Sequence, residues 1–165
     1  YSVSYAPHFA GFYIFLEFVF MEGVAWFSHK YIMHGFLWSL HKDHHKKDHD
    51  SHFERNDAFF LFYAAVSAGF VVLWGEYGFW PGLAIALGIF AYGLSYFFVH
   101  DIFIHQRVKW FRNANTRYAR AIRRAHKIHH KNLSKEKGEC FGMLWVPMKT
   151  LKNKSLGPSH LNGSR

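Results

Sequence analysis

Residues 29–45 read HKYIMHGFLWSLHKDHH, and their five histidines form two clusters at the end of a long apolar segment. The first cluster has a five-residue spacing, and the second has the spacing His-x-x-His-His. Both spacings return later in the chain, one after a second apolar stretch and one within a basic stretch. Ten of the fourteen histidines thus fall in four clusters: His29 and His34; His41, His44 and His45; His100 and His105; His126, His129 and His130.

These spacings suit metal ligands carried on helices. Residues three and four apart share a helical face, so a His-x-x-His-His cluster can face one cavity. Adjacent histidines diverge by about 100°, and histidines five apart diverge by about 140° on a regular helix. One cluster can therefore reach two metals, or a helix distortion can align the five-residue pair. Imidazole suits iron, zinc, copper and nickel, and so many unpaired imidazoles beside lipid would go unsatisfied. We therefore predict a polynuclear metal site.

Charge is segregated along the 165-residue chain, which has a formal net charge of +9. Residues 56–106 contain no lysine or arginine, whereas residues 107–137 carry eleven of the twenty. A groove for nucleic acid would interleave basic residues with the fold, so the pattern argues against a nucleic-acid partner. It favours an integral membrane protein with basic cytoplasmic ends.

Three apolar segments are long enough, or nearly so, to cross a bilayer. Residues 9–28 are interrupted only by Glu17 and Glu22, and acids at such depth usually face a bundle interior. A place near the interface is the alternative for Glu22. Residues 59–74 and 79–99 form a helical hairpin around an almost uncharged turn, so all four histidine clusters are expected on the opposite, cytoplasmic side.

The predicted fold class is all-α, as an integral membrane bundle of three to four transmembrane helices in a single domain, residues 1–165. Residues 1–8 and 161–165 are interpreted as a lead and a tail without functional weight. Residues 116–131 predict a basic amphipathic helix, whose charges are expected to face solvent or lipid headgroups. His49 and His52 lie in a polar connection outside the clusters, and we do not expect them to be ligands. Carboxylates near the clusters are candidates to accept the second N–H of ligand imidazoles: Asp43, Asp57 and Asp101.

The order of the histidine clusters, in a small helical membrane protein, resembles the fatty acid hydroxylase superfamily of non-haem di-iron membrane oxygenases. Within this superfamily, several blocks of the sequence look most like the bacterial-type β-carotene 3-hydroxylases. They include His29–Gly35, residues 54–57, His100-Asp101 and His105-Gln106-Arg107. The matching blocks run from about residue 20 to residue 147. The histidine pattern alone is shared with enzymes acting on sterols and acyl lipids, whereas the block around His100 is more specific.

The resemblance implies O2-dependent hydroxylation of the two rings of β-carotene, through β-cryptoxanthin to zeaxanthin. It further implies two iron ions held by the ten clustered histidines, with electrons from NAD(P)H through a ferredoxin-type donor, in the bacterial inner membrane. Zinc is an alternative occupant after purification. An elongated carotenoid must enter from the bilayer, and apolar residues beside the clusters are candidates for its groove, with ordinary helix packing as the alternative: Phe36, Leu37, Trp38, Tyr92, Tyr96, Phe97 and Phe103.

Three other functions stay open at this level. A related oxygenase can act on a sterol or an acyl lipid, and a carotenoid ketolase shares the chemistry. A metal-binding or metal-transporting membrane protein without redox chemistry is the alternative from another class. A transporter needs ligands along a pathway at the bilayer midplane, whereas these clusters gather at the ends of the apolar segments. The sequence does not define the oligomeric state.

Overall fold

A computed structural model describes residues 6–46, 50–51 and 53–152, and every regular element among them is a helix. This result confirms the all-α prediction. The elements in chain order are α1 (Ala6–Phe27), η1 (Ser28–Phe36), α2 (Trp38–His45), α3 (Asp57–Tyr77), α4 (Trp80–Tyr96), η2 (Phe97–Ile104), α5 (Arg117–His130) and α6 (Met148–Lys152).

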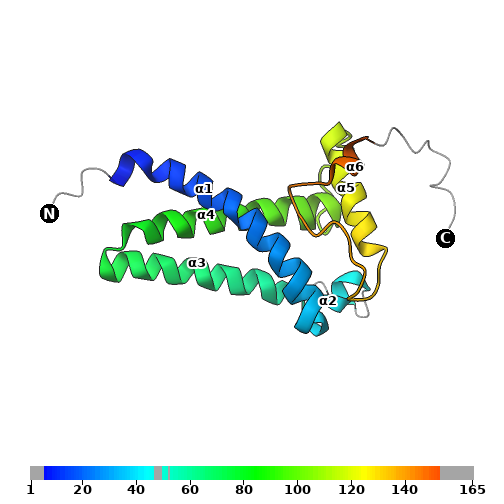
Figure 1. The fold of residues 1–165 in the computed structure, drawn as a ribbon, viewed down its shortest axis with the longest axis horizontal. Helices are drawn as coiled ribbons and strands as arrows, with labels where there is room; N and C mark the ends of the chain where they lie inside the picture. Colours follow the sequence, from blue (N-terminus) through cyan, green and yellow to red (C-terminus); the bar gives the residue numbers. More distant parts are fainter. Residues whose placement is uncertain (1–5, 47–49, 52, 153–165) are drawn as a thin grey trace.

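Three helical stretches of the described chain are long and apolar enough to cross a membrane: Phe9–Phe36, Asp57–Tyr77 and Trp80–Ile104. They match the three predicted segments, and Gly78 ends α3 in the left-handed conformation that a tight turn requires. In Figure 1 the hairpin turn lies at one end of the bundle, while α2, α5 and α6 gather at the other. The chain is a membrane protein with a small non-spanning end.

Helix α4 lies between α1 and α3 and packs against both. Small residues permit the close approach. A Cβ added to Gly88 would lie 2.5 Å from the Cβ of Glu17 on α1, and one added to Gly82 would lie 2.8 Å from the carbonyl oxygen of Phe70 on α3. The absence of a side chain at Gly82 and Gly88 therefore lets α4 pack closely against both neighbouring helices.

Both transmembrane stretches that carry a five-residue histidine pair end in π-helix, in which N–H groups bond to the carbonyl five residues earlier. The N–H of His105 bonds to the carbonyl of His100 at 2.8 Å, and the N–H of Leu37 bonds to that of Ile32 at 3.0 Å. Such a helix places residues five apart on one face. Of the two explanations that helix geometry left open for the five-residue spacing, two ions or a helix distortion, the distortion is therefore present, and it brings each pair into one group.

Helix α5 begins after Thr116, whose hydroxyl caps it by accepting the N–H of Ala119 at 3.1 Å. Its buried face carries Ala121, Ile122 and Ala125 together with two of the clustered histidines. The predicted amphipathic helix is thus present. Three of its arginines also bond to backbone carbonyls outside the helix, two of them in the loop before α5 and one in α6, a use of the basic face that the sequence did not indicate: Arg120, Arg123 and Arg124.

Candidate metal centre

The ten clustered histidines converge at the end of the bundle opposite the hairpin turn. Nine of them form two groups, in each of which one ring nitrogen per residue lies within 4.8 Å of the others. The first group consists of His29, His34, His41, His45 and His129, and the second of His44, His100, His105 and His126. Four helical segments, η1, α2, η2 and α5, therefore contribute histidines to one double site.

Neighbouring histidines of one cluster serve different groups, as the helical geometry predicts. His44 belongs to the second group and His45 to the first, because adjacent side chains diverge by about 100°. The ring of His130 lies between the groups, with centroids 4.6 Å from His45 and 4.4 Å from His126. Its Nε2 is buried and has no hydrogen-bond partner among the described residues. His130 is thus positioned to serve either group.

In the first group every Nδ1 bonds to an oxygen. His41 reaches Oδ1 of Asn56 at 2.6 Å, and the other four histidines reach backbone carbonyls at 2.9–3.1 Å. Because those oxygens only accept, each Nδ1 carries the proton, and each Nε2 of a neutral ring is a lone-pair acceptor. These Nε2 atoms nevertheless approach one another at 3.1–3.3 Å. Facing lone pairs do not hydrogen-bond, so this arrangement fits a cation between them.

In the second group, two of the four histidines bond through Nδ1 to carboxylates at the periphery of the site. Nδ1 of His44 bonds to Glu54 at 2.8 Å, and Nδ1 of His100 bonds to Asp101 at 3.3 Å. The inward Nε2 atoms of His44 and His100 lie 2.9 Å apart, and those of His105 and His126 lie 2.7 Å apart. The carboxylates fix the ring orientation and raise the basicity of the inward nitrogen.

Burial keeps these rings neutral, which is the form that binds metals. Removal from water lowers the pKa of His41, His105 and His129 to about 2, and neighbouring histidines add to the effect. Burial likewise lowers the pKa of His45 to about 4. The donor set is entirely imidazole within both groups, a set that iron, zinc, copper and nickel accept. The residues therefore fit the polynuclear metal site that the sequence predicts and the two metal ions that the resemblance implies.

The three predicted outer carboxylates differ in what they contact. Asp101 bonds to Nδ1 of His100. Asp43 accepts the backbone N–H of Arg55 at 2.7 Å, and Asp57 accepts the N–H of Glu54 at 3.0 Å, so these two order the residues around the site.

Sequence reasoning missed Glu54 and Asn56 as imidazole partners, although both lie in the block at 54–57 that carries the resemblance. Arg107 ties this block to the second group by ion pairs to Glu54 at 2.9 Å and to Asp101 at 3.0 Å. His49 and His52 lie outside the described residues.

An apolar cavity of about 610 Å³ lies among α1, α3 and α4 and reaches one histidine of each group, His29 and His100. Three of the predicted groove residues line it: Tyr92, Tyr96 and Phe97. The cavity thus provides an apolar space that opens onto both groups.

The other four predicted groove residues do not line this cavity. Phe36 is 77% exposed at the end of η1, and Leu37 follows it at the start of α2. The ring of Trp38 lies against that of His34, with centroids 5.0 Å apart. Phe103 points toward α5, because it packs under the guanidinium of Arg123. Trp38 and Phe103 thus contact other side chains of the protein and do not line this cavity.

Comparison with known proteins adds independent information. The family model described as fatty acid hydroxylase matches residues 14–150. The chain is 39% identical over 134 residues to a β-carotene hydroxylase of Pantoea ananas, which covers 81% of this chain and 75% of that protein. It is 36% identical over 133 residues to a β-carotene hydroxylase of Pseudescherichia vulneris, covering 81% and 74%. It is also 36% identical over 134 residues to a chloroplastic β-carotene 3-hydroxylase of Arabidopsis thaliana, covering 77% and 42%. No solved structure matches the chain.

Proposed function

Because the chain belongs to the fatty acid hydroxylase family, we propose that it is a di-iron membrane monooxygenase that hydroxylates the rings of β-carotene at carbon 3. The first hydroxylation would give β-cryptoxanthin, and the second would give zeaxanthin. The names of the bacterial and plant relatives support the substrate. The observation that carries the proposal is the convergence of two sets of imidazole lone pairs beside one apolar cavity.

The first and second groups would each hold one iron ion, with His130 between them. Iron bound there would supply activation of O2, with electrons delivered from NAD(P)H through a ferredoxin-type donor. The protein's own contribution is to hold the imidazoles. The outer oxygens on Nδ1 keep the rings of the first group, and those of His44 and His100, in one tautomer with Nε2 inward.

The cavity would position the substrate. It is lined largely by aromatic and aliphatic side chains and lies between membrane-spanning helices, so an apolar molecule can reach it from the bilayer. One ring of an elongated carotenoid would lie near His29 and His100. Tyr96 and Phe97 at its wall would exclude water and hold the ring carbon in place, which is how positioning lowers the barrier to reaction.

We propose that the histidine end faces the cytoplasm of a bacterial inner membrane. The supporting observation is the absence of lysine and arginine from residues 56–106 and their density in residues 107–137. Single cysteines in place of Tyr77, at the hairpin turn, and Leu133, near the histidines, would test it in a Cys140→Ser background. A membrane-impermeant thiol reagent should label intact cells at residue 77 and not at residue 133. The reverse pattern would contradict the orientation.

Pigment analysis tests the activity directly. Cells that make β-carotene should accumulate zeaxanthin and β-cryptoxanthin when they express this chain, and only β-carotene when they express His129→Ala. The matched control is Lys127→Ala on the exposed face of the same helix, which should behave like the unaltered chain. A keto product would identify a ketolase. Unchanged β-carotene in iron-replete cells that contain the protein would redirect the search to sterols and acyl lipids.

A further inference from the structure

A carboxylate on α1 binds a distant part of the chain. Oε1 of Glu22 accepts the backbone N–H groups of Met143, Leu144 and Trp145 at 2.9, 3.0 and 2.9 Å. Its Oε2 accepts the hydroxyl of Tyr92, on α4, at 2.7 Å. Three successive backbone N–H groups pointing at one oxygen form an anion-binding nest. Glu22 therefore faces the protein interior rather than the interface. It connects the segment after α5 to helices α1 and α4.

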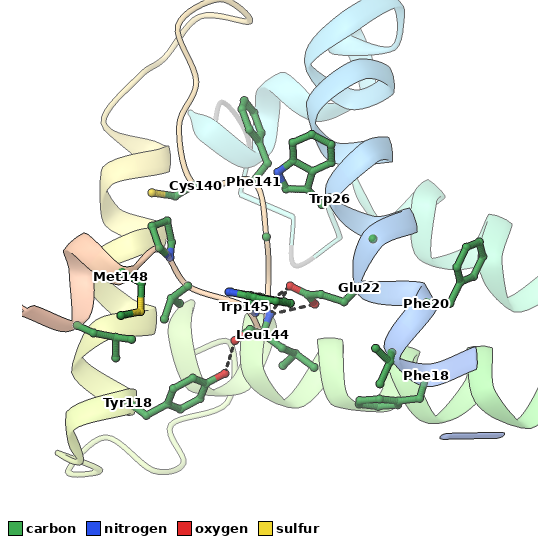
Figure 2. Close-up of a pocket in the computed structure, with 16 residues that line it drawn as sticks. Phe18, Phe20, Glu22, Trp26, Tyr118, Cys140, Phe141, Leu144, Trp145 and Met148 are labelled. Carbon is green, nitrogen blue, oxygen red and sulfur yellow. Dashed lines mark hydrogen bonds between the residues drawn. The ribbon is translucent and has the colours of Figure 1, made fainter. Parts of the chain in front are cut away.

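The segment that Glu22 holds, residues 132–147, is called the strap here. It runs from the end of α5 to α6 (Figure 1). Figure 2 shows its anchoring point, where Glu22 projects from α1 onto Leu144 and Trp145, and Tyr118 of α5 bonds to the carbonyl of Leu144 on the other side. The strap is thus held by side chains from two helices, Glu22 of α1 and Tyr118 of α5.

Gly142 makes this contact possible. A Cβ at this position would lie 2.7 Å from the carbonyl oxygen of Trp145 and 3.2 Å from Oε1 of Glu22. The backbone therefore turns tightly on the carboxylate, with no room for a side chain.

The strap supplies the outer hydrogen-bond acceptors for four of the five histidines of the first group. All four acceptors are backbone carbonyls, at 2.9–3.1 Å from Nδ1: Asn132 for His45, Lys135 for His34, Glu139 for His129 and Phe141 for His29. The position of the strap therefore decides the tautomer and the orientation of these rings.

The second group does not depend on the strap in this way. The described partners of its Nδ1 atoms are side chains from other elements, Glu54 for His44 and Asp101 for His100. The two groups consequently have separate outer supports, one of backbone carbonyls on the strap and one of carboxylates held by Arg107.

We propose that Glu22 is a positioning residue for the first metal alone: by anchoring the strap, it holds the four carbonyls that orient the first group's imidazoles. The inference rests on the proposed function, in that both groups are taken to bind metal. It assigns to this membrane-embedded acid a role in metal retention that involves no contact with the metal or the substrate.

The test is the metal content of the purified protein in detergent after anaerobic loading with ferrous iron. Glu22→Ala removes both acceptor oxygens, and it should lower the content from two ions to about one, since loss of an outer partner weakens metal binding about 10–100-fold. Glu22→Gln keeps one carbonyl oxygen for the strap amides and should restore much of the loss. Glu17→Ala, on the same helix against α4, is the matched control and should retain both ions.

A second variant disturbs the contact between Glu22 and the strap by a change in the strap itself. Gly142→Ala forces a Cβ between the strap backbone and Glu22, so it should also release one ion, whereas Gly23→Ala, with nothing within 4 Å, should release none. Faster hydrogen exchange of the strap amides should accompany the loss in Glu22→Ala.

The outcomes separate this inference from the function. Two ions retained in both Glu22→Ala and Gly142→Ala would overturn it, and so would loss of both ions, which would show that Glu22 supports the whole fold. An unaltered chain that binds two ions without hydroxylating β-carotene would instead overturn the proposed function. The single-ion outcome in the variants would still support the role of Glu22.

Discussion

At the scale of single residues, the histidines are defined by what their outward nitrogens contact. In the first group every Nδ1 donates to an oxygen, and this forces the inward Nε2 atoms to present lone pairs to one another. A protein without a bound cation gains nothing from such an arrangement, because buried polar groups without partners are costly. The oxygens outside the histidines are therefore as informative as the histidines themselves.

Removing Glu54, one of the two outer carboxylates of the second group, should affect metal binding selectively. Glu54→Ala deletes the acceptor of His44 Nδ1 and one ion-pair partner of Arg107. Metal affinity at that group should fall about 10–100-fold, while the first group keeps its ion. Iron content per chain measures this loss, with Glu76→Ala at the exposed hairpin turn as the control. An unchanged affinity would show that Glu54 does not orient His44.

A side chain placed inside the cavity should block the substrate and spare the metals. Gly93 lines the cavity, and an added Cβ would meet only Phe60 at 3.9 Å, so Gly93→Leu should fit and occupy the space. Hydroxylated carotenoid should fall about tenfold or more, because small displacements of a reacting carbon are costly, while iron content stays constant. Gly69→Leu, exposed on α3, should leave both unchanged. Full activity of Gly93→Leu would place the substrate elsewhere.

At the scale of elements, the two π-helical ends explain the five-residue spacing. An α-helix would rotate His105 away from His100, whereas the i to i+5 hydrogen bond at 2.8 Å brings both to the same cavity. The spanning helices are thus regular in the bilayer and distorted only where they present ligands. The rotation of the last turn thus lets each of these two spanning helices present both histidines of a pair to one site.

Packing between α1 and α4 should be sensitive to a single methyl group. Gly88→Ala places a Cβ 2.5 Å from the Cβ of Glu17 and 3.0 Å from the carbonyl oxygen of Ile14, and both neighbours lie on a rigid helix. Overpacking of this kind costs about 1–3 kcal/mol. Thermal unfolding in detergent should show the loss, and Gly11→Ala, with nothing within 4 Å, should not. Equal stability of the two variants would indicate a looser helix pair.

At the scale of the whole molecule, the histidines join parts of the chain that the bilayer would otherwise leave loosely connected. The spanning helices contribute η1 and η2, while α2 and α5 lie outside the three candidate spans. Metal binding should therefore hold the non-spanning end onto the bundle, since a ligand that binds only the folded state stabilises it.

Metal removal should lower the unfolding temperature of the whole chain. At a free metal concentration of 100 times Kd, binding contributes about 2.7 kcal/mol per site, and this stabilisation is lost after dialysis against a chelator. Differential scanning fluorimetry in detergent would measure the change. Ferrous iron should restore the unfolding temperature, whereas Mg²⁺, which prefers oxygen ligands, should not. Identical unfolding with and without chelation would contradict a structural role for the metals.

The sequence by itself determined the spanning segments, the amphipathic helix and the ten histidines, because apolar length, helical periodicity and residue type are local properties. Helix geometry also offered the distortion at the five-residue pairs as one of two explanations, and the structure decided between them.

Only the tertiary structure decided the division of the histidines into two groups and the partners of their Nδ1 atoms. Most Nδ1 partners in the first group are backbone carbonyls of the strap. Because every residue type has a backbone carbonyl, no pattern of side chains in the sequence predicts these partners. The contact of Glu22 with the strap, more than a hundred residues away in sequence, is likewise a product of folding. Local chemistry named the candidate ligands, and long-range packing determined how their rings are held.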